Sequence, residues 1–275
     1  IMVAALIGIT TSQLFQFSKL GLDTYLWGWV AIILCGLLGL VEDFKNNFLS
    51  PRFRLACLTA IFVVLFTAWP WLIPVELGVP ILSSLMALPV IGLLLAVLVC
   101  VGFINAVNMA DGANGLMSGI AFVAFTLFAS IAGADAWVWG IVSYIVGVFL
   151  IFNVVSGRLF LGDCGAYALG SLMVIGSFSL VNKGLVSPAF LAVLFAYPCL
   201  ELVISLIRRT VGGQSAFLPD NDHFHNRLHY FVTLRVTSPV IANSGTGLLI
   251  VLMTSGVAFA GHYFELLLAT DGQWG

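Results

Sequence analysis

Long apolar runs separated by short polar connections dominate the pattern of this chain. A helix needs about 20 apolar residues to cross a bilayer, and windows of that length recur along the whole sequence. The predicted spans are residues 1–17, 25–41, 55–74, 81–104, 116–133, 136–155, 164–181, 187–206 and 240–268. The pattern therefore predicts an all-α fold: a polytopic integral membrane helical bundle with about nine transmembrane helices in this chain.

The connections between these spans fall alternately on two sides, and the cations are concentrated on one of them. Side one holds residues 42–54, 105–115, 156–163 and 207–238, and side two holds 18–24, 75–80, 134–135, 182–186 and the C-terminus. Of the ten Lys and Arg residues, only Lys19 and Lys183 lie on side two. By the positive-inside rule, side one faces the cytoplasm.

Composition excludes a soluble protein, because 61% of the residues are hydrophobic and only 8% are charged. A soluble domain is typically about 25% charged. We interpret residues 1–275 as a single membrane-embedded domain, in which 207–238 is a cytoplasmic loop too short to fold alone. The first residue is Ile, inside an apolar run, which favours a fragment or processed chain that lacks one or more N-terminal helices.

Neither the charges nor the cysteines indicate a nucleic-acid or zinc-binding protein. The sequence has no basic run of the kind that binds nucleic acid. Its five cysteines lie in apolar segments without paired spacing, so we interpret them as small buried hydrophobic residues.

The most polar stretch next to an apolar run is residues 105–119, on side one. Asn105, Asn108 and Asp111 recur every third position, so a helix would place them along one side. Gly112 and Gly115 allow a ligand or another segment to approach the backbone closely. The alternative is a polar helix end followed by an Asx/Gly turn.

Two further side-one connections carry isolated acids. Glu42 and Asp43 are adjacent at the end of a predicted helix, where they could chelate a cation or hold a proton-accepting group. They could equally be interfacial charges that flank a span. Asp163 lies between Gly162 and Gly165, which favours a crowded metal or phosphate site, with a helix cap as the alternative.

The last side-one connection is rich in histidine and arginine. Three histidines lie within seven residues, at 223, 225 and 229, but no closed tetrahedral ligand set accompanies them. With Arg208, Arg209 and Arg227 nearby, they suit contact with phosphate oxygens, unless the segment is an ordinary solvated loop. Glu201 lies within a predicted span and is expected to face the interior of the bundle.

Together these connections provide the groups that phosphoryl transfer needs at a membrane surface. Carboxylate and amide oxygens suit Mg²⁺ or Mn²⁺, and arginines and helix ends suit a diphosphate. We expect the groups to meet around one divalent ion at the inner leaflet.

The motifs, in this order, resemble those of the polyprenyl-phosphate N-acetylhexosamine-1-phosphate transferases. The resemblance spans about residues 42–229 and includes N-x-x-N-x-x-D-G-x-N-G-L from Asn105 and G-D-x-G from Gly162. It implies an enzyme of the bacterial inner (plasma) membrane with its active site on the cytoplasmic face. Such an enzyme moves a sugar-1-phosphate from a UDP-sugar to undecaprenyl phosphate and releases UMP.

The resemblance also implies roles for individual residues. Glu42, Asp43, Asp111 and Asp163 would form the catalytic set, with Asp163 as the Mg²⁺ ligand. The acidic pair would activate the lipid phosphate or assist metal binding. The residues matching substrate-binding positions are Asn105, Asn108, Gly112, Asn114, Asn153, Phe160, Asp220, His223, His225 and Arg227. Among them, Gly112 and Asn114 match a turn that contacts uridine, and Phe160 matches an aromatic ring that stacks on uracil.

Departures from the family pattern narrow the expected substrate. Glu42 replaces an Asp, Asn114 stands where many members have Asp, and Asn226 replaces a His. We therefore favour a UDP-HexNAc substrate that feeds O-antigen-like polymers, with phospho-MurNAc-pentapeptide transfer as the alternative. The departures also keep open a non-catalytic scaffold, and a transporter is the rival from another class. A homodimer is a further option.

Overall fold

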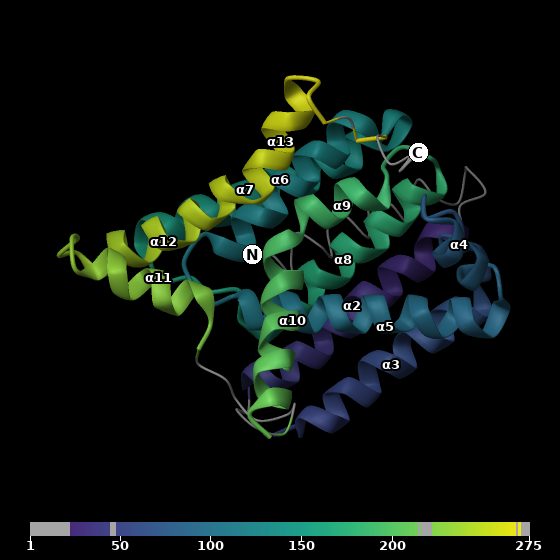
Figure 1. The fold of residues 1–275 in the computed structure, drawn as a ribbon, viewed down its shortest axis with the longest axis horizontal. Coiled ribbons are helices and arrows are strands. Elements are labelled where there is room, and N and C mark those ends of the chain that lie inside the picture. Colours follow the sequence, from purple (N-terminus) through teal and green to yellow (C-terminus); the bar gives the residue numbers. More distant parts are fainter. Residues whose placement is uncertain (1–22, 45–47, 214, 216–221, 268, 271–275) are drawn as a thin grey trace. The chain divides into compact units, whose positions relative to one another are not determined.

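The computed structural model describes residues 23–44, 48–213, 215, 222–267 and 269–270 (Figure 1). Within these ranges the regular secondary structure is entirely helical, as the sequence predicts. The chain divides into two compact units. The first comprises Ile1–Ile104 and Gly162–Asn182, and the second comprises Asn105–Leu161 and Lys183–Gly275. The predicted span 1–17 lies outside the described residues, and the prediction of one membrane-embedded domain stays a prediction.

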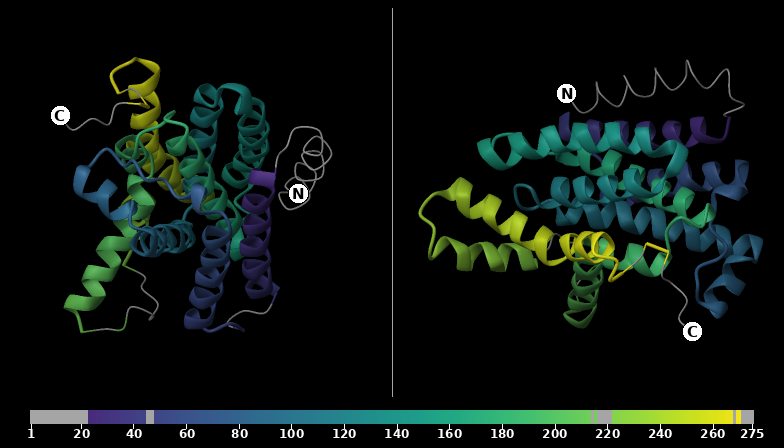
Figure 2. Two further views of the ribbon diagram at one scale, coloured as in Figure 1. Left: turned by 90° about the vertical axis from the view of Figure 1, so that its right-hand side faces the viewer. Right: turned by 90° about the horizontal axis from the view of Figure 1, so that it is seen from above.

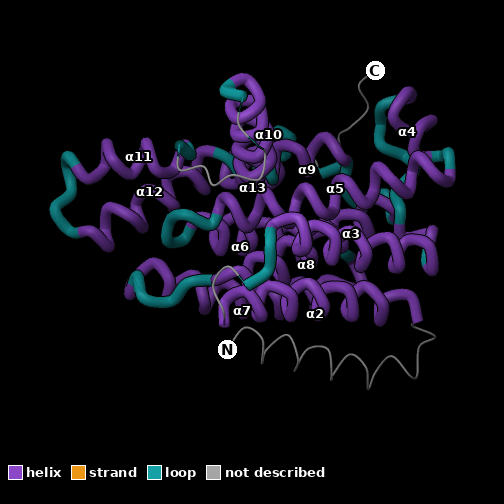
Figure 3. Tube along the Cα trace, turned by 90° about the horizontal axis from the view of Figure 1, so that it is seen from below, coloured by secondary structure: helices purple, strands orange, loops and turns teal. Residues whose placement is uncertain are grey.

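The first unit is built around the pair α2 and α8, which lie side by side in Figures 1 and 3. Its helices are α2 (Asp23–Phe44), α3 (Pro51–Ala68), η1 (Pro70–Leu72), α4 (Pro80–Met86), most of α5 (Pro89–Ala110) and α8 (Gly162–Asn182). A Cβ atom at Gly39 of α2 would lie 2.3 Å from the carbonyl oxygen of Asp163. The absence of a side chain at Gly39 therefore allows α2 to approach the start of α8 closely.

Local sequence sets the start of α3. Ser50 is the N-cap residue, and its hydroxyl accepts the N–H of Phe53 at 3.2 Å. Pro51 occupies the first helical position, where its missing N–H removes no helical hydrogen bond.

The second unit consists of packed helical hairpins. Its helices are the end of α5, α6 (Leu116–Ile131), η2 (Gly133–Asp135), α7 (Ala136–Ser156), α9 (Pro188–Leu194), α10 (Ala196–Val211), α11 (Phe224–Thr233), α12 (Pro239–Met253) and α13 (Ser255–Tyr263). The α11–α12 hairpin lies at the left of the right-hand view in Figure 2. The core between α6 and α7 includes Trp139, whose ring stacks on Phe125 and meets Phe128 edge-on.

Two predicted spans of this unit are bent helix pairs rather than single helices. The axis turns by 78° between α9 and α10, and by 44° between α12 and α13. Pro198 explains the first bend, because its ring has no N–H for the carbonyl of Leu194 and would clash with that carbonyl in a continuous helix. The carbonyl of Leu194 instead accepts the hydroxyl of Ser255 at 2.6 Å, at the start of α13.

The number of helices that could cross a membrane is smaller in the described residues than the sequence predicted. Five are long and apolar enough, or up to seven if each bent pair is one span, so a total of about nine is not confirmed. The predicted span 81–104 begins later, at Pro89 of α5, because Pro89 breaks the helix after α4. The apolar α6 has 16 residues, fewer than a typical span. The chain is nonetheless a multi-pass membrane protein.

Candidate functional site

The first group of candidate residues lies at the start of α8, within the first unit. The Asp43 carboxylate, near the end of α2, accepts the backbone N–H groups of Asp163 and Cys164 at 2.8 and 2.9 Å. These two donors belong to the first turn of α8, where they lack partners within the helix. Asp43 therefore caps α8, a role that the sequence suggested for Asp163.

Arg54 of α3 joins two acids of the same group. Its Nη1 atom lies 3.1 Å from Oδ2 of Asp163 and 3.7 Å from Oε1 of Glu42. Glu42 is buried, and its Oε2 atom also accepts the N–H of Leu49 at 3.1 Å. We call Glu42, Asp43, Arg54 and Asp163 the acidic cluster. Sequence reasoning did not select Arg54 as a site residue, although it follows the acidic pair closely and has the opposite charge.

The acidic cluster fits a divalent cation that takes most of its ligands from substrate and water. No group of three His, Cys, Asp or Glu side chains that could hold a metal ion occurs among the described residues. Mg²⁺, however, is usually bound by one or two carboxylates together with substrate phosphates. The Asp163 carboxylate, with 26% of its side chain exposed, is suitably placed to be one of them.

The second group surrounds the turn after α5, within the second unit. Asn105 and Asn108 lie in the last turns of α5, and Asp111 follows the helix directly, so only the two amides are helical. The backbone N–H of Asn114 donates to Oδ1 of Asn243 of α12 at 2.6 Å, and its side-chain amide lies 3.4 Å from the Ser244 hydroxyl. These bonds attach the turn to α12. We call residues 111–115 the amide turn.

Asn153 of α7 is buried and holds the same turn from the other side. Its Oδ1 atom accepts the N–H of Gly115, and its Nδ2 atom donates to the carbonyl of Leu159. Gly115 has a φ of 78°, a conformation that favours glycine. Both polar atoms of the Asn153 amide are thus used inside the protein. Phe160, by contrast, is 69% exposed, as a ring that stacks on a ligand would be, and this role stays a prediction.

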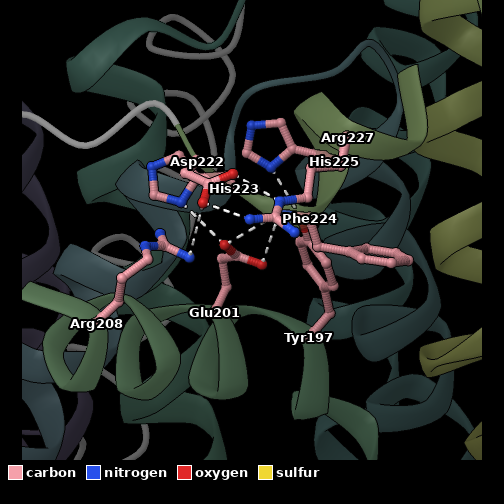
Figure 4. A network of polar contacts seen from close by, with 8 residues as sticks. All are labelled: Tyr197, Glu201, Arg208, Asp222, His223, Phe224, His225 and Arg227. Carbon is pink, nitrogen blue, oxygen red and sulfur yellow. Dashed lines mark hydrogen bonds and ion pairs between the residues drawn. The ribbon is translucent and has the colours of Figure 1, made fainter. Parts of the chain in front are cut away.

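The third group is a buried network between α10 and the start of α11, shown in Figure 4. Oε1 of Glu201 lies 2.9 Å from Nδ1 of His223, and both carboxylate oxygens of Glu201 accept the N–H of Phe224. The Tyr197 hydroxyl lies 2.9 Å from Nδ1 of His225. The two imidazole rings stack with their centroids 5.3 Å apart. We call Tyr197, Glu201, His223 and His225 the histidine cluster.

Exposed ion pairs border the histidine cluster. Asp222 bonds Nε and Nη2 of Arg227, which raises the pKa of that guanidinium, and it lies 3.9 Å from Nη1 of Arg208. Arg227 thus projects from α11 beside an acid of its own segment. Asp220, a predicted substrate-binding residue, lies outside the described residues.

His225 connects the histidine cluster to the amide turn. A Cβ atom at Gly112 would lie only 2.0 Å from Nε2 of His225, so the imidazole packs directly on the glycine backbone. Burial, with a smaller contribution from His223, lowers the pKa of His225 to about 4. The ring is therefore neutral at pH 7. Two motifs that are more than a hundred residues apart in the sequence meet here, within one unit. The expected meeting of the acidic cluster with the amide turn and the histidine cluster around one ion stays a prediction.

Comparison with known proteins identifies similarity to one enzyme family. The model of glycosyl transferase family 4 matches residues 25–181. The phospho-N-acetylmuramoyl-pentapeptide-transferase of Bacillus licheniformis is 26% identical over 239 residues, which cover 82% of this chain and 72% of the relative. The undecaprenyl-phosphate alpha-N-acetylglucosaminyl 1-phosphate transferase of Thermotoga maritima is 32% identical over 190 residues, covering 69% of this chain and 57% of the relative.

Proposed function

Since the chain belongs to glycosyl transferase family 4, we propose that it transfers a HexNAc-1-phosphate from a UDP-sugar to undecaprenyl phosphate and releases UMP. The match over residues 25–181 carries this proposal, because it contains all four predicted catalytic acids: Glu42, Asp43, Asp111 and Asp163. The two relatives are named for different transferred sugars, and together they support a transferase that moves a sugar phosphate.

In the proposed reaction, an oxygen of the lipid phosphate attacks the phosphorus that carries the sugar. A new phosphorus–oxygen bond forms, the bond to the bridging oxygen breaks, and UMP leaves with that oxygen. The second pKa of a phosphate monoester is about 6, so the attacking group is mostly ionised at pH 7. Catalysis then depends on orientation and on offsetting negative charge more than on a strong base.

Each cluster has a part in this scheme. Asp163 would hold Mg²⁺, or Mn²⁺ in its place, which would offset charge on the diphosphate. Asp43 is already engaged by two backbone N–H groups, which favours a role in holding the start of α8 over deprotonating the lipid phosphate. The amide turn would bind the uridine, with Phe160 stacked on the uracil ring. The histidine cluster would bind the diphosphate or the sugar.

The direct test is a panel of UDP-sugars incubated with the purified protein, undecaprenyl phosphate and Mg²⁺. We expect UMP release and a lipid product whose mass corresponds to an added HexNAc-1-phosphate. A product formed only with UDP-MurNAc-pentapeptide would instead establish the second candidate, which the Bacillus licheniformis relative favours by its name. Uptake of labelled nucleotide sugar into proteoliposomes without UMP release would contradict both and indicate a transporter.

The remaining parts of the proposal concern location. We place the active site on the cytoplasmic face of the bacterial inner membrane, because eight of the ten cations fall on the predicted side one. The orientation can be tested with cysteines introduced at Arg158 and Lys183. Their reaction with an impermeant reagent is compared between intact cells and inverted vesicles.

A homodimer is a further proposal, and the mass of the purified protein in detergent tests it.

A further inference from the structure

Glu201 is an acid of α10 that the proposed reaction does not use. Only 4% of the residue is exposed, and burial of a carboxylate is costly unless donors surround it. Its partners are Nδ1 of His223 and the backbone N–H of Phe224, both at the start of α11. One side chain therefore caps α11 and bonds the imidazole that precedes it.

The bond to Glu201 determines which nitrogen of His223 carries the proton. Both carboxylate oxygens of Glu201 already accept the N–H of Phe224, so the geometry favours Nδ1 of His223 as the donor to Oε1. In the neutral ring, Nε2 is then unprotonated and lies on the edge away from Glu201. That atom can accept a hydrogen bond from a hydroxyl group.

The neighbouring His225 has the opposite arrangement. The Tyr197 hydroxyl lies 2.9 Å from Nδ1 of His225, and a buried hydroxyl is best satisfied when it donates. Nδ1 of the neutral His225 ring thus accepts, and its proton is on Nε2, which packs against Gly112. The geometry therefore favours different tautomers in the two stacked rings, because a carboxylate binds one ring and a phenol binds the other.

We propose that Glu201 is a positioning residue that fixes the Nδ1–H tautomer of His223, so that Nε2 is the atom offered to the substrate. The role in turnover rests on the proposed function, whereas the tautomer does not. A carboxylate that orients a histidine acts through that histidine and need not touch substrate.

The test combines a spectroscopic measurement with kinetics. The chain has four histidines, so ¹⁵N-histidine labelling in detergent gives few signals, which single substitutions assign. Wild-type His223 should show a protonated Nδ1 and an unprotonated Nε2. Glu201→Gln has the same shape, but its amide can donate as well as accept, so we expect a mixed tautomer. Glu201→Asp keeps an acceptor-only group and should restore the wild-type pattern.

The kinetic expectation follows the same order. Glu201→Gln should lower kcat by about 10- to 100-fold, the cost typical of a misplaced group, with a smaller effect on KM, and Glu201→Asp should recover part of the loss. Glu76→Gln, an exposed acid in the first unit, is the matched control and should leave both values unchanged.

The outcomes separate this inference from the proposed function. Protonated Nε2 in wild-type His223, or an unchanged tautomer together with unchanged kcat in Glu201→Gln, would overturn it. A loss of thermal stability in Glu201→Gln with the tautomer and kcat unaltered would show a capping role only, and would also overturn it. If the tautomers behave as expected but no UDP-sugar is turned over, the proposed function fails and the assignment of the tautomer stands.

Discussion

Asp43 and Asp163 are joined through the backbone, since the carboxylate of Asp43 accepts the N–H of Asp163 at 2.8 Å. The side chain of Asp163 is left to interact with Arg54. Two acids that look alike in the sequence therefore have different tasks: one fixes the start of α8, and the other is the proposed metal ligand.

The two acids should respond differently to neutralisation. Asp43→Asn loses one of two accepting oxygens at a helix start, which costs about 1 kcal/mol and should lower the thermal midpoint. Asp163→Asn should leave the midpoint near that of the wild type but reduce exchange of UMP with UDP-HexNAc by at least about 100-fold. Melting curves and the exchange assay measure both effects. Full activity in Asp163→Asn would remove the metal assignment.

Arg54 should become a larger determinant of stability when no divalent ion is present. Its guanidinium lies between the carboxylates of Glu42 and Asp163, and Arg54→Gln leaves these like charges uncompensated. A ligand that binds only the folded state stabilises it, so Mg²⁺ should raise the thermal midpoint more in this variant than in the wild type. Arg52→Gln, an exposed residue of the same helix, is the control. An equal response to Mg²⁺ in all three proteins contradicts the expectation.

A methyl group at Gly112 should uncouple the histidine cluster from the amide turn. In Gly112→Ala the new Cβ overlaps Nε2 of His225, so the ring must move and its bond to Tyr197 weakens. We expect a loss of UMP formation of about 100-fold. In a His225→Ala background, Gly112→Ala should reduce UMP formation much less, because the effects of substitutions at residues in contact are not additive. Gly102→Ala is the control, since a Cβ there meets no atom within 4 Å; equal losses in both backgrounds would disprove the coupling.

The low pKa of His225 makes stability depend on pH. The folded protein keeps this ring neutral down to about pH 4, whereas the unfolded chain binds a proton below about pH 6.5. The unfolded state binds more protons between these values, so stability is fully present above about pH 6.5 and falls as the pH decreases. His225→Gln should reduce this fall by about 1–2 kcal/mol at pH 5. Melting curves across this range, with His229→Gln for comparison, test it; parallel curves for wild type and His225→Gln would contradict it.

Local signals in the sequence predicted local features of the fold. Ser50 followed by Pro51 is a typical helix start, and α3 begins there. Apolar windows located α2, α7 and α8 to within a few residues. The bent pairs were missed because a hydropathy window measures composition and not direction. Pro198 was the available signal for the first bend, since a proline removes the N–H that a continuous helix needs.

Contacts between distant segments could not be predicted in the same way. Asn114 bonds Asn243, 129 residues away, and no spacing rule relates them. The family resemblance selected Asn153 as a substrate-binding residue, but not the Gly115 and Leu159 backbone groups that it bonds. Glu201 was expected to face the interior, and it does, yet its partner His223 depends on how the segment after α10 returns.

The hydrogen bond from Ser255 to the carbonyl of Leu194 has a consequence for biosynthesis. During synthesis, the bend between α9 and α10 at Leu194 is made about sixty residues before Ser255, whose hydroxyl bonds the Leu194 carbonyl. A buried carbonyl that lacks a donor costs free energy, so the bend at Leu194 is incomplete until Ser255 has been synthesised. Helix α13 is therefore required to complete this bend, and chains that end before Ser255 should fold less stably.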